Sequence, residues 1–183
     1  LLLSLLWRRS RLPAVAGLVV LVAYVGFQFL QLQRAVDFGE RAAREQGLTG
    51  VKVSALPRPV SPFNWMVIVA EDDRYRYASV RTVDRAPLLA SLSPWIERLA
   101  APYVPAERAV WDVAYRFGPD HDTRGVAQAA WQAPGLAFFR WFAAAPLAVE
   151  VRRGNPSTCV WFQDLRFLTP GRDQWPFRYG ACR

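Results

Sequence analysis

The residues best suited to acid–base or metal chemistry lie in one short segment around the only histidine of the chain. His121 stands between Asp120 and Asp122 in the sequence FGPDHDTRG. Adjacent residues of an extended loop point in different directions, whereas a metal site needs three or more ligands that converge. We therefore interpret the segment as a solvated loop whose aspartate caps the next helix. We expect no metal ligand and no catalytic residue in this chain.

A second candidate is a pair of opposite charges near the C-terminus. In the sequence CVWFQDLRF, Asp164 and Arg166 are two residues apart, so on a strand they would share one face. An ion pair of Asp164 with Arg166, or with Arg178 on another strand, is the ordinary interpretation. A ligand-binding pair is the alternative, and the spacing leaves both open.

Three adjacent carboxylates, Glu71, Asp72 and Asp73, separate two strand-like segments. Acidic residues at such a position are typical of an exposed turn. We expect a hairpin turn here.

The two cysteines, Cys159 and Cys182, lie in two strand-like segments. In an oxidising compartment they could form one disulfide. The alternative is two buried thiols, which pack as small apolar side chains. The sequence does not decide between them.

The aromatic string FFRWF offers either a partner surface or part of a core. On a helix Phe138, Trp141 and Phe142 occupy positions i, i+3 and i+4, which predicts one core-facing stripe, and Arg140 points elsewhere. Contact with a partner or with lipid head groups is the alternative.

These residues need a folded scaffold, and the pattern of apolar residues predicts an α+β domain. Alternation and β-branched residues predict strands at 51–56, 64–71, 75–83, 147–152, 158–168 and 177–182. Alanine-rich segments bounded by prolines predict helices at 94–101, 106–115, 123–133 and 136–145. We expect a mainly antiparallel sheet with several short helices.

The domain is expected to be attached to a membrane. Residues 12–33 contain no charged side chain and follow Arg8, Arg9 and Arg11, and such a stretch is long enough to cross a bilayer. It exceeds the apolar core of a signal peptide, and no cleavage site follows it. Since residues 1–7 are also mostly apolar, we interpret 1–33 as the end of one transmembrane helix, a short basic loop and a full transmembrane helix of a longer protein. A helical extension at 34–49, in which Gly47 is a natural end for the helix, and a soluble domain at 50–183 follow.

Charge gives the orientation of this anchor and the kind of partner. The net charge is +8 and Lys52 is the only lysine, yet no compact basic block or RNA-binding signature is present, so we expect no nucleic-acid partner. The basic cluster before the apolar stretch places that loop in the cytoplasm and the large domain outside it. The expected partner is the lipid bilayer.

Four segments carry a family resemblance: SPFNWMVIVAEDDRY (61–75), AFFRWFA (137–143), TCVWFQDLRFLTPGR (158–172) and PFRYGACR (176–183). Together they resemble the C-terminal region of bacterial YdjM-like membrane-bound metal-dependent hydrolases, also called LexA-binding inner membrane-associated hydrolases. The resemblance implies the bacterial inner membrane, a periplasmic domain, and a divalent metal held by histidines and aspartates of upstream transmembrane helices that this chain lacks.

Two functions follow from the resemblance and the residues together. The first is the extramembrane portion of a metal-dependent hydrolase, which docks on its own upstream helices and has no catalytic metal of its own. The alternative is a non-catalytic, membrane-anchored binding or interaction module.

Overall fold

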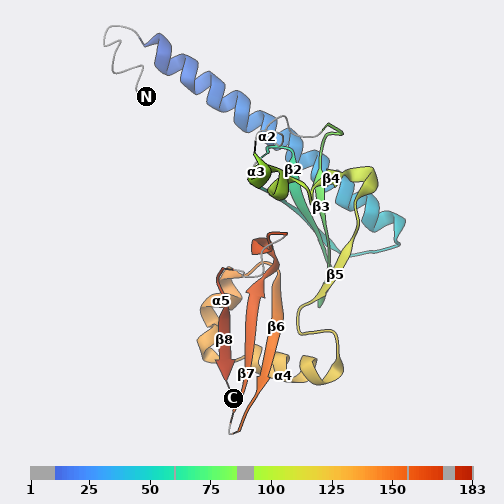
Figure 1. The fold of residues 1–183 in the computed structure, drawn as a ribbon. Coiled ribbons are helices and arrows are strands. Elements are labelled where there is room, and N and C mark those ends of the chain that lie inside the picture. The colour runs from blue at the N-terminus through green and yellow to red at the C-terminus, as the bar shows by residue number, and fades with distance from the viewer. Residues whose placement is uncertain (1–10, 60, 86–92, 156, 171–175, 183) are drawn as a thin grey trace.

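The computed structural model describes residues 11–59, 61–85, 93–155, 157–170 and 176–182 (Figure 1). A long apolar helix precedes two sheets and several short helices. This arrangement confirms the predicted α+β class with mainly antiparallel strand pairing. The basic cluster at Arg8 and Arg9 and the apolar residues before it lie outside the described residues.

The helix α2 (Leu12–Glu45) runs without a break from the apolar stretch into the domain. It is long and apolar enough to cross a membrane. Gly47, at φ +67°, lies just past its end, where the amide of Leu48 donates to the carbonyl of Ala43. This left-handed glycine ends the helix at the predicted place, because a residue without Cβ adopts that conformation at little cost.

The first sheet contains five strands. They are β1 (Lys52–Pro57), β2 (Asn64–Ala70), β3 (Arg74–Arg81), β4 (Val104–Pro105) and β5 (Asp112–Tyr115). The strand order is β1-β2-β3-β4, and β5 pairs with β3; only the β3–β4 pairing is parallel. The predicted hairpin is β2–β3, with Val67 opposite Ala78.

The second half of α2 covers one face of the first sheet. Its buried positions are Gln31, Ala35, Gly39, Ala42 and Ala43. They meet a cluster that contains Trp65, Val67, Ala78 and Val80. A Cβ atom on Gly39 would lie 2.6 Å from Cγ1 of Val53 and from Cγ1 of Val67, so helix and sheet are in close contact there.

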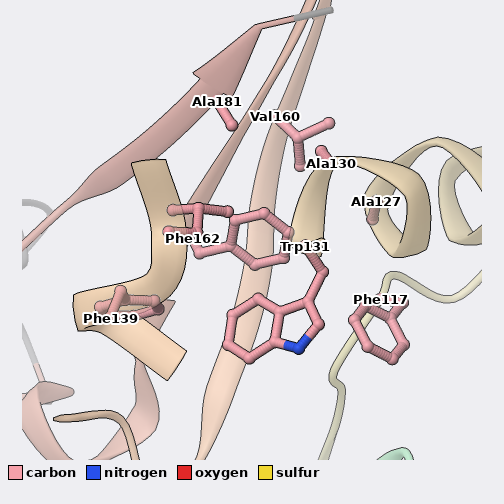
Figure 2. Packing of buried hydrophobic residues seen from close by; sticks show 9 residues of the cluster. Phe117, Ala127, Ala130, Trp131, Phe139, Val160, Phe162 and Ala181 are labelled. Carbon is pink, nitrogen blue, oxygen red and sulfur yellow. The ribbon is translucent and has the colours of Figure 1, made fainter. Parts of the chain in front are cut away.

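The second sheet is antiparallel in the order β6 (Pro146–Arg153), β7 (Thr158–Asp164) and β8 (Tyr179–Cys182). The helices α4 (His121–Trp131) and α5 (Ala137–Phe142), with the short 3₁₀ helix η3 (Pro134–Leu136), pack on it. Trp131 lies at the centre of this core, with its ring centroid 5.1 Å from that of Phe162 and 6.0 Å from that of Phe139 (Figure 2).

A third apolar cluster joins the two sheets. Met66, Ile68 and Tyr75 of the first sheet pack with two leucines of the second half of the domain. These are Leu147 of β6 and Leu165 directly after β7. The two sheets are therefore held together by apolar contacts between their side chains as well as by the covalent connection of the polypeptide.

The helix predicted at 106–115 is wrong. Only a 3₁₀ turn, η2 (Ala106–Arg108), forms there, and β5 follows it. Residues 112–115 pair with Arg74–Tyr77 along the free edge of β3. An unpaired strand edge offers hydrogen bonds that outweigh the modest helix preference of an alanine-containing segment.

The other predicted helices at 94–101, 123–133 and 136–145 are confirmed as α3 (Pro94–Ala100), α4 and α5. Ser93 caps α3 and accepts from the amide of Trp95. The strand predicted at 158–168 ends earlier, because a 3₁₀ turn, η4 (Leu165–Phe167), begins directly after Asp164.

Candidate functional site

Asp164 and Arg166 are brought together at the end of β7, although not on one strand face. Asp164 is completely buried, and its Oδ2 lies 2.7 Å from Nη2 of Arg166. Its carboxylate also accepts from the amides of Ala144 and Arg166, each at 2.9 Å. The hydrogen-bonding capacity of the carboxylate is therefore satisfied by groups of the domain itself. These bonds attach the turn after β7 and the loop at Ala144 to the sheet.

Arg178 does not join this pair. Its guanidinium pairs with Glu150 on β6 and lies over the ring of Trp161, 4.8 Å from the centroid. The predicted alternative of an Asp164–Arg178 ion pair is therefore not formed, because Arg178 pairs with Glu150 and Asp164 with Arg166.

The junction of the two sheets also contains Arg58. Its Nη1 donates to the carbonyl of Arg166 at 3.0 Å, and its Nη2 contacts Sδ of Met66. Burial lowers the pKa of Arg58 below its ordinary value, and burial raises the pKa of the nearby core residue Tyr75 to about 12. The Tyr75 hydroxyl thus remains neutral at physiological pH and cannot act as a ready proton acceptor.

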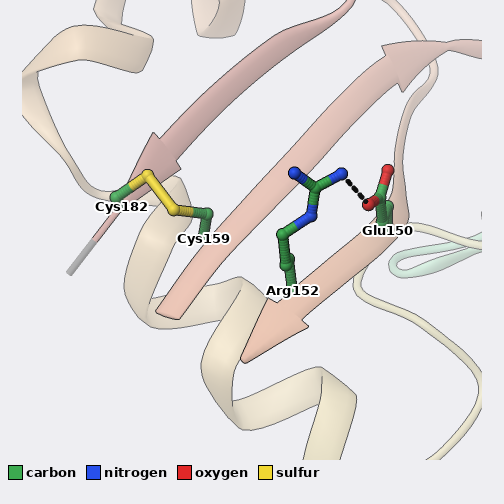
Figure 3. Close-up of a disulfide and its surroundings, with 4 residues drawn as sticks. All are labelled: Glu150, Arg152, Cys159 and Cys182. Atoms are coloured by element: carbon green, nitrogen blue, oxygen red, sulfur yellow. Dashed lines mark hydrogen bonds and ion pairs between the residues drawn. A yellow bond between two sulfur atoms is a disulfide. The ribbon is translucent and has the colours of Figure 1, made fainter. Parts of the chain in front are cut away.

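Cys159 and Cys182 form a disulfide between paired positions of β7 and β8, with a sulfur–sulfur distance of 2.05 Å (Figure 3). The sequence left this pairing open against two free thiols. Glu150 and Arg152 on the neighbouring strand β6 form an ion pair at 3.0 Å.

The His121 segment has the geometry of a helix cap. Asp120 is the N-cap of α4, and its Oδ1 accepts from the amide of Thr123 at 2.7 Å. This hydrogen bond lowers the pKa of Asp120. His121 is fully exposed, and its Nδ1 lies 3.8 Å from a carboxylate oxygen of Asp122. Within the described ranges, no group of three or more histidine, cysteine or acidic side chains is disposed to hold a metal ion.

Glu71, Asp72 and Asp73 form the hairpin turn, as predicted, and Glu71 also forms ion pairs with two arginines of β3. The carboxylate of Glu71 pairs with Arg74, and its Oε1 accepts from Nε of Arg76 at 2.9 Å. The hydrogen bond from Arg74 lowers the pKa of Glu71. The arrangement stabilises the turn, and Asp72 lies exposed beside it.

Two cavities lie beside the second half of α2: one of about 200 Å³ against residues 80–84 and 106–107, and one of about 400 Å³ against residues 106–111. Phe38 lines both, and its ring stacks on that of Trp111 with centroids 5.5 Å apart. Arg41 and Glu107 also line both cavities. Charges of both signs face the space, so it does not select for a ligand of one charge.

The most unusual surface of the second sheet is aromatic. We define the aromatic surface as Phe138, Trp141, Phe142, Phe167, Phe177 and Tyr179. Trp141 is 80% exposed, Phe138 54% and Phe177 53%, although large apolar side chains usually bury most of their area. The predicted core stripe is therefore wrong for Phe138 and Trp141, whereas Phe142 is half-buried and packs against the core.

The side chains that do enter the core here are Phe139 of α5 and Leu136 at the end of η3. These two are also three residues apart, so the helix has apolar residues on two faces, and periodicity alone does not identify the buried one. Arg140 does not resolve this choice, because it lies on the side of α5 away from Phe138 and is itself half-buried. Its Nη1 donates to the carbonyl of Ala133 at 3.0 Å.

No protein-family model, curated protein or solved structure matches this chain. Function is therefore inferred from its own residues and their arrangement.

Proposed function

We propose that this chain is a membrane-anchored, non-catalytic binding module that holds its α+β domain in a fixed orientation at a bilayer surface. The observation that carries the proposal is the division of one unbroken helix into two halves. The first half of α2 lies bare, and the second half is built into the core of the first sheet.

The first half has the character of a membrane segment. Its exposed apolar side chains include Leu18, Val19, Val22, Val25 and Leu30, and their exposure is not confined to one stripe of the helix. A helix that is apolar on all sides is stable in lipid, whereas water would disfavour each of these side chains.

The second half of α2 holds the domain rigidly to the membrane helix. Ala35, Gly39 and Ala43 are buried against the sheet, and no linker separates them from the apolar half. A domain joined in this way cannot rotate freely about its anchor, as it would on a flexible linker. A fixed orientation is useful to a module that presents one surface to a partner at the membrane.

We further propose the bacterial inner membrane as the location, with the domain in the periplasm. Arg8, Arg9 and Arg11 precede the apolar stretch as a tighter cluster than Arg34, Arg41 and Arg44 after it, which favours a cytoplasmic N-terminal side. The Cys159–Cys182 disulfide supports an oxidising compartment for the domain.

The second candidate is the extramembrane portion of a metal-dependent hydrolase with its metal in upstream helices. It is favoured by the proximity of the segments that carry the family resemblance. α5, β7 and β8 share one core, and Met66 and Tyr75 of the β2–β3 hairpin pack on Leu165 directly after β7. Metal analysis of a chain extended upstream, with this chain as the reference, tests this candidate; metal in neither would contradict it.

The anchor is tested by alkaline extraction and vesicle flotation of the full chain. We expect the chain to remain with the lipid, and the double variant Val19→Arg with Val22→Arg to be released, because each arginine at the centre of a spanning helix costs about 2.5–3.5 kcal/mol. The matched control is Val110→Arg with Val113→Arg, which adds the same charge at exposed positions of the domain. Release of the unmodified chain into the aqueous fraction would refute the proposal.

Orientation is tested separately by alkylation of Cys159 and Cys182 in intact cells after mild reduction. A reagent that does not cross the inner membrane should label them if the domain is periplasmic. Labelling only after the inner membrane is permeabilised would place the domain in the cytoplasm.

A further inference from the structure

We propose that the aromatic surface lies in the head-group layer of the same bilayer that α2 enters, so that the domain touches the membrane at a second place. This inference rests on the membrane attachment proposed above. It assigns a lipid-contact role to residues on α5, after β7 and at the start of β8.

The rings form a continuous surface. The centroid of Phe142 lies 5.8 Å from that of Phe138 and 5.9 Å from that of Phe167. Phe177 extends the surface, 4.8 Å from Phe167, and Trp141 lies 5.8 Å from Phe138 at the opposite end. An exposed apolar patch of this kind marks a contact with a partner or a membrane.

Phe177 is held in this surface by a backbone conformation that phenylalanine seldom adopts. Its φ is +60°, the left-handed region, where a Cβ atom is unfavourable. The conformation places its ring against Phe142 and Phe167 while half of the side chain remains exposed. Such strain is typical of functional positions.

The charges around these rings do not repel anionic head groups. The guanidinium of Arg166 lies 5.0 Å from the centroid of Phe142 and 5.5 Å from that of Phe167. Asp164, which is completely buried, balances this charge, and Arg166 is the outer member of the pair. Residues 136–142, 165–170 and 176–179 contain no acidic residue. Tryptophan, tyrosine and arginine together are the residues that favour the membrane interface.

The arrangement of the elements places α5, which carries Phe138 and Trp141, on the side of the domain toward which the bare half of α2 projects. In Figure 1 the bare half of α2 projects to the upper left, and α5 and α3 lie on the left of their sheets. α3 carries a further exposed tryptophan, Trp95. The C-terminus and the disulfide lie at the opposite end of the second sheet. Because α2 is docked without a linker, this side remains directed toward the bilayer.

The test uses the full chain in vesicles of phosphatidylcholine and phosphatidylglycerol whose acyl chains carry bromine, which quenches nearby tryptophan. Trp141→Phe should remove part of the emission that these lipids quench. The matched control is Trp161→Phe, which removes one indole from the other face of β7, where Arg178 covers it; this variant should lose only unquenched emission. Quenching of Trp141 should not fall as the phosphatidylglycerol content rises, because the segments that carry the rings contain no acidic residue that would repel anionic lipid.

Two results would overturn the inference while leaving the anchor intact. If the chain floats with vesicles but Trp141 is quenched by aqueous iodide and not by brominated lipid, the surface faces water. If Trp141 is shielded from both quenchers, a second copy or another protein covers it. A chain that does not float at all would refute the membrane attachment itself.

The contribution of the rings is measured with the double variant Phe138→Ser and Phe177→Ser. Both side chains are about half exposed, so the fold should be retained, and near-ultraviolet circular dichroism checks this. We expect the quenching of Trp141 by brominated lipid to fall, with flotation unchanged. Unchanged quenching would show that these rings make no contact with the bilayer.

Discussion

The two sheets of this domain are stabilised in different ways. The first sheet is covered by a helix whose contact residues are small, such as Ala35, Gly39 and Ala43, and the contact is close. The second sheet has three strands, is covered by short helices, and depends on the large rings of Trp131 and Phe162 and on a disulfide. The first arrangement couples the domain to its anchor, and the second compensates for a small sheet.

The difference follows from the lengths of the elements. A long helix can bury many small residues along a sheet, and the sum of these contacts fixes its position. Short helices offer few contact positions, so each must bury more area, which favours aromatic side chains. A covalent link between β7 and β8 then restricts the unfolded chain further.

The largest expected effect comes from Trp131→Ala in the second sheet. Removal of a buried indole at the centre of the core should lower the free energy of unfolding by about 3–5 kcal/mol. Urea unfolding of the detergent-solubilised chain measures the loss, and hydrogen exchange of β7 should increase more than that of β2. The control is Trp141→Ala, at an exposed position, with an expected change of less than about 0.5 kcal/mol. Equal losses in both variants would contradict the assignment of the two indoles.

The second effect is loss of the disulfide in the double variant Cys159→Ser and Cys182→Ser. Closure of a chain segment with a sequence separation of 23 residues should contribute about 3 kcal/mol. Reduction of the unmodified chain should reproduce the change, and hydrogen exchange should increase in β7 and β8. A reducing agent should leave the double variant unaffected. Faster exchange confined to the first sheet would argue against this assignment.

The third effect tests the close helix contact of the first sheet. In Gly39→Ala the new methyl group would lie 2.6 Å from side-chain atoms of Val53 and Val67, so we expect a loss of about 1–3 kcal/mol from overpacking. Exchange should increase in β1 and β2 and remain unchanged in β7. Gly26→Ala is the matched control, because no atom lies within 4 Å of its added Cβ. Similar behaviour of the two variants would refute the close docking of α2.

The smallest effect is the pH dependence of the β2–β3 turn. The pKa of Glu71 is lowered in the folded state, chiefly by the hydrogen bond from Arg74. A carboxyl with a lowered pKa stabilises the fold above its unfolded pKa, and this stabilisation is lost as the pH falls through the folded value. The difference in stability between the unmodified chain and Glu71→Gln should therefore shrink from about pH 7 to about pH 3. Asp72→Asn, at the exposed neighbour, is the control; a difference that is constant with pH would contradict the ion pair.

The prediction of secondary structure succeeded where local signals agreed with the tertiary environment. The hairpin around Glu71 and the end of α2 at Gly47 depend on turn chemistry and on one glycine, which act over a few residues. The helix predicted at 106–115 failed because β5 depends on the edge of β3, about forty residues earlier in the chain.

The prediction of the site was partial for a similar reason. The spacing of Asp164 and Arg166 indicated a pair, and the pair forms, but by a turn that buries the carboxylate rather than along a strand. Exposure of Trp141 was missed, because a helix with apolar residues on two faces does not state which face meets the sheet.

The sequence by itself determined that an uncharged stretch long enough to cross a bilayer precedes an α+β domain, since hydropathy, turn residues and helix caps are properties of neighbouring residues. Only the tertiary structure decided that the strands divide into two sheets, that the same helix is bare in one half and docked in the other, and that six aromatic rings, three of them exposed, form one continuous surface. These features depend on which distant segments share buried area, and that choice is made by packing of the whole chain.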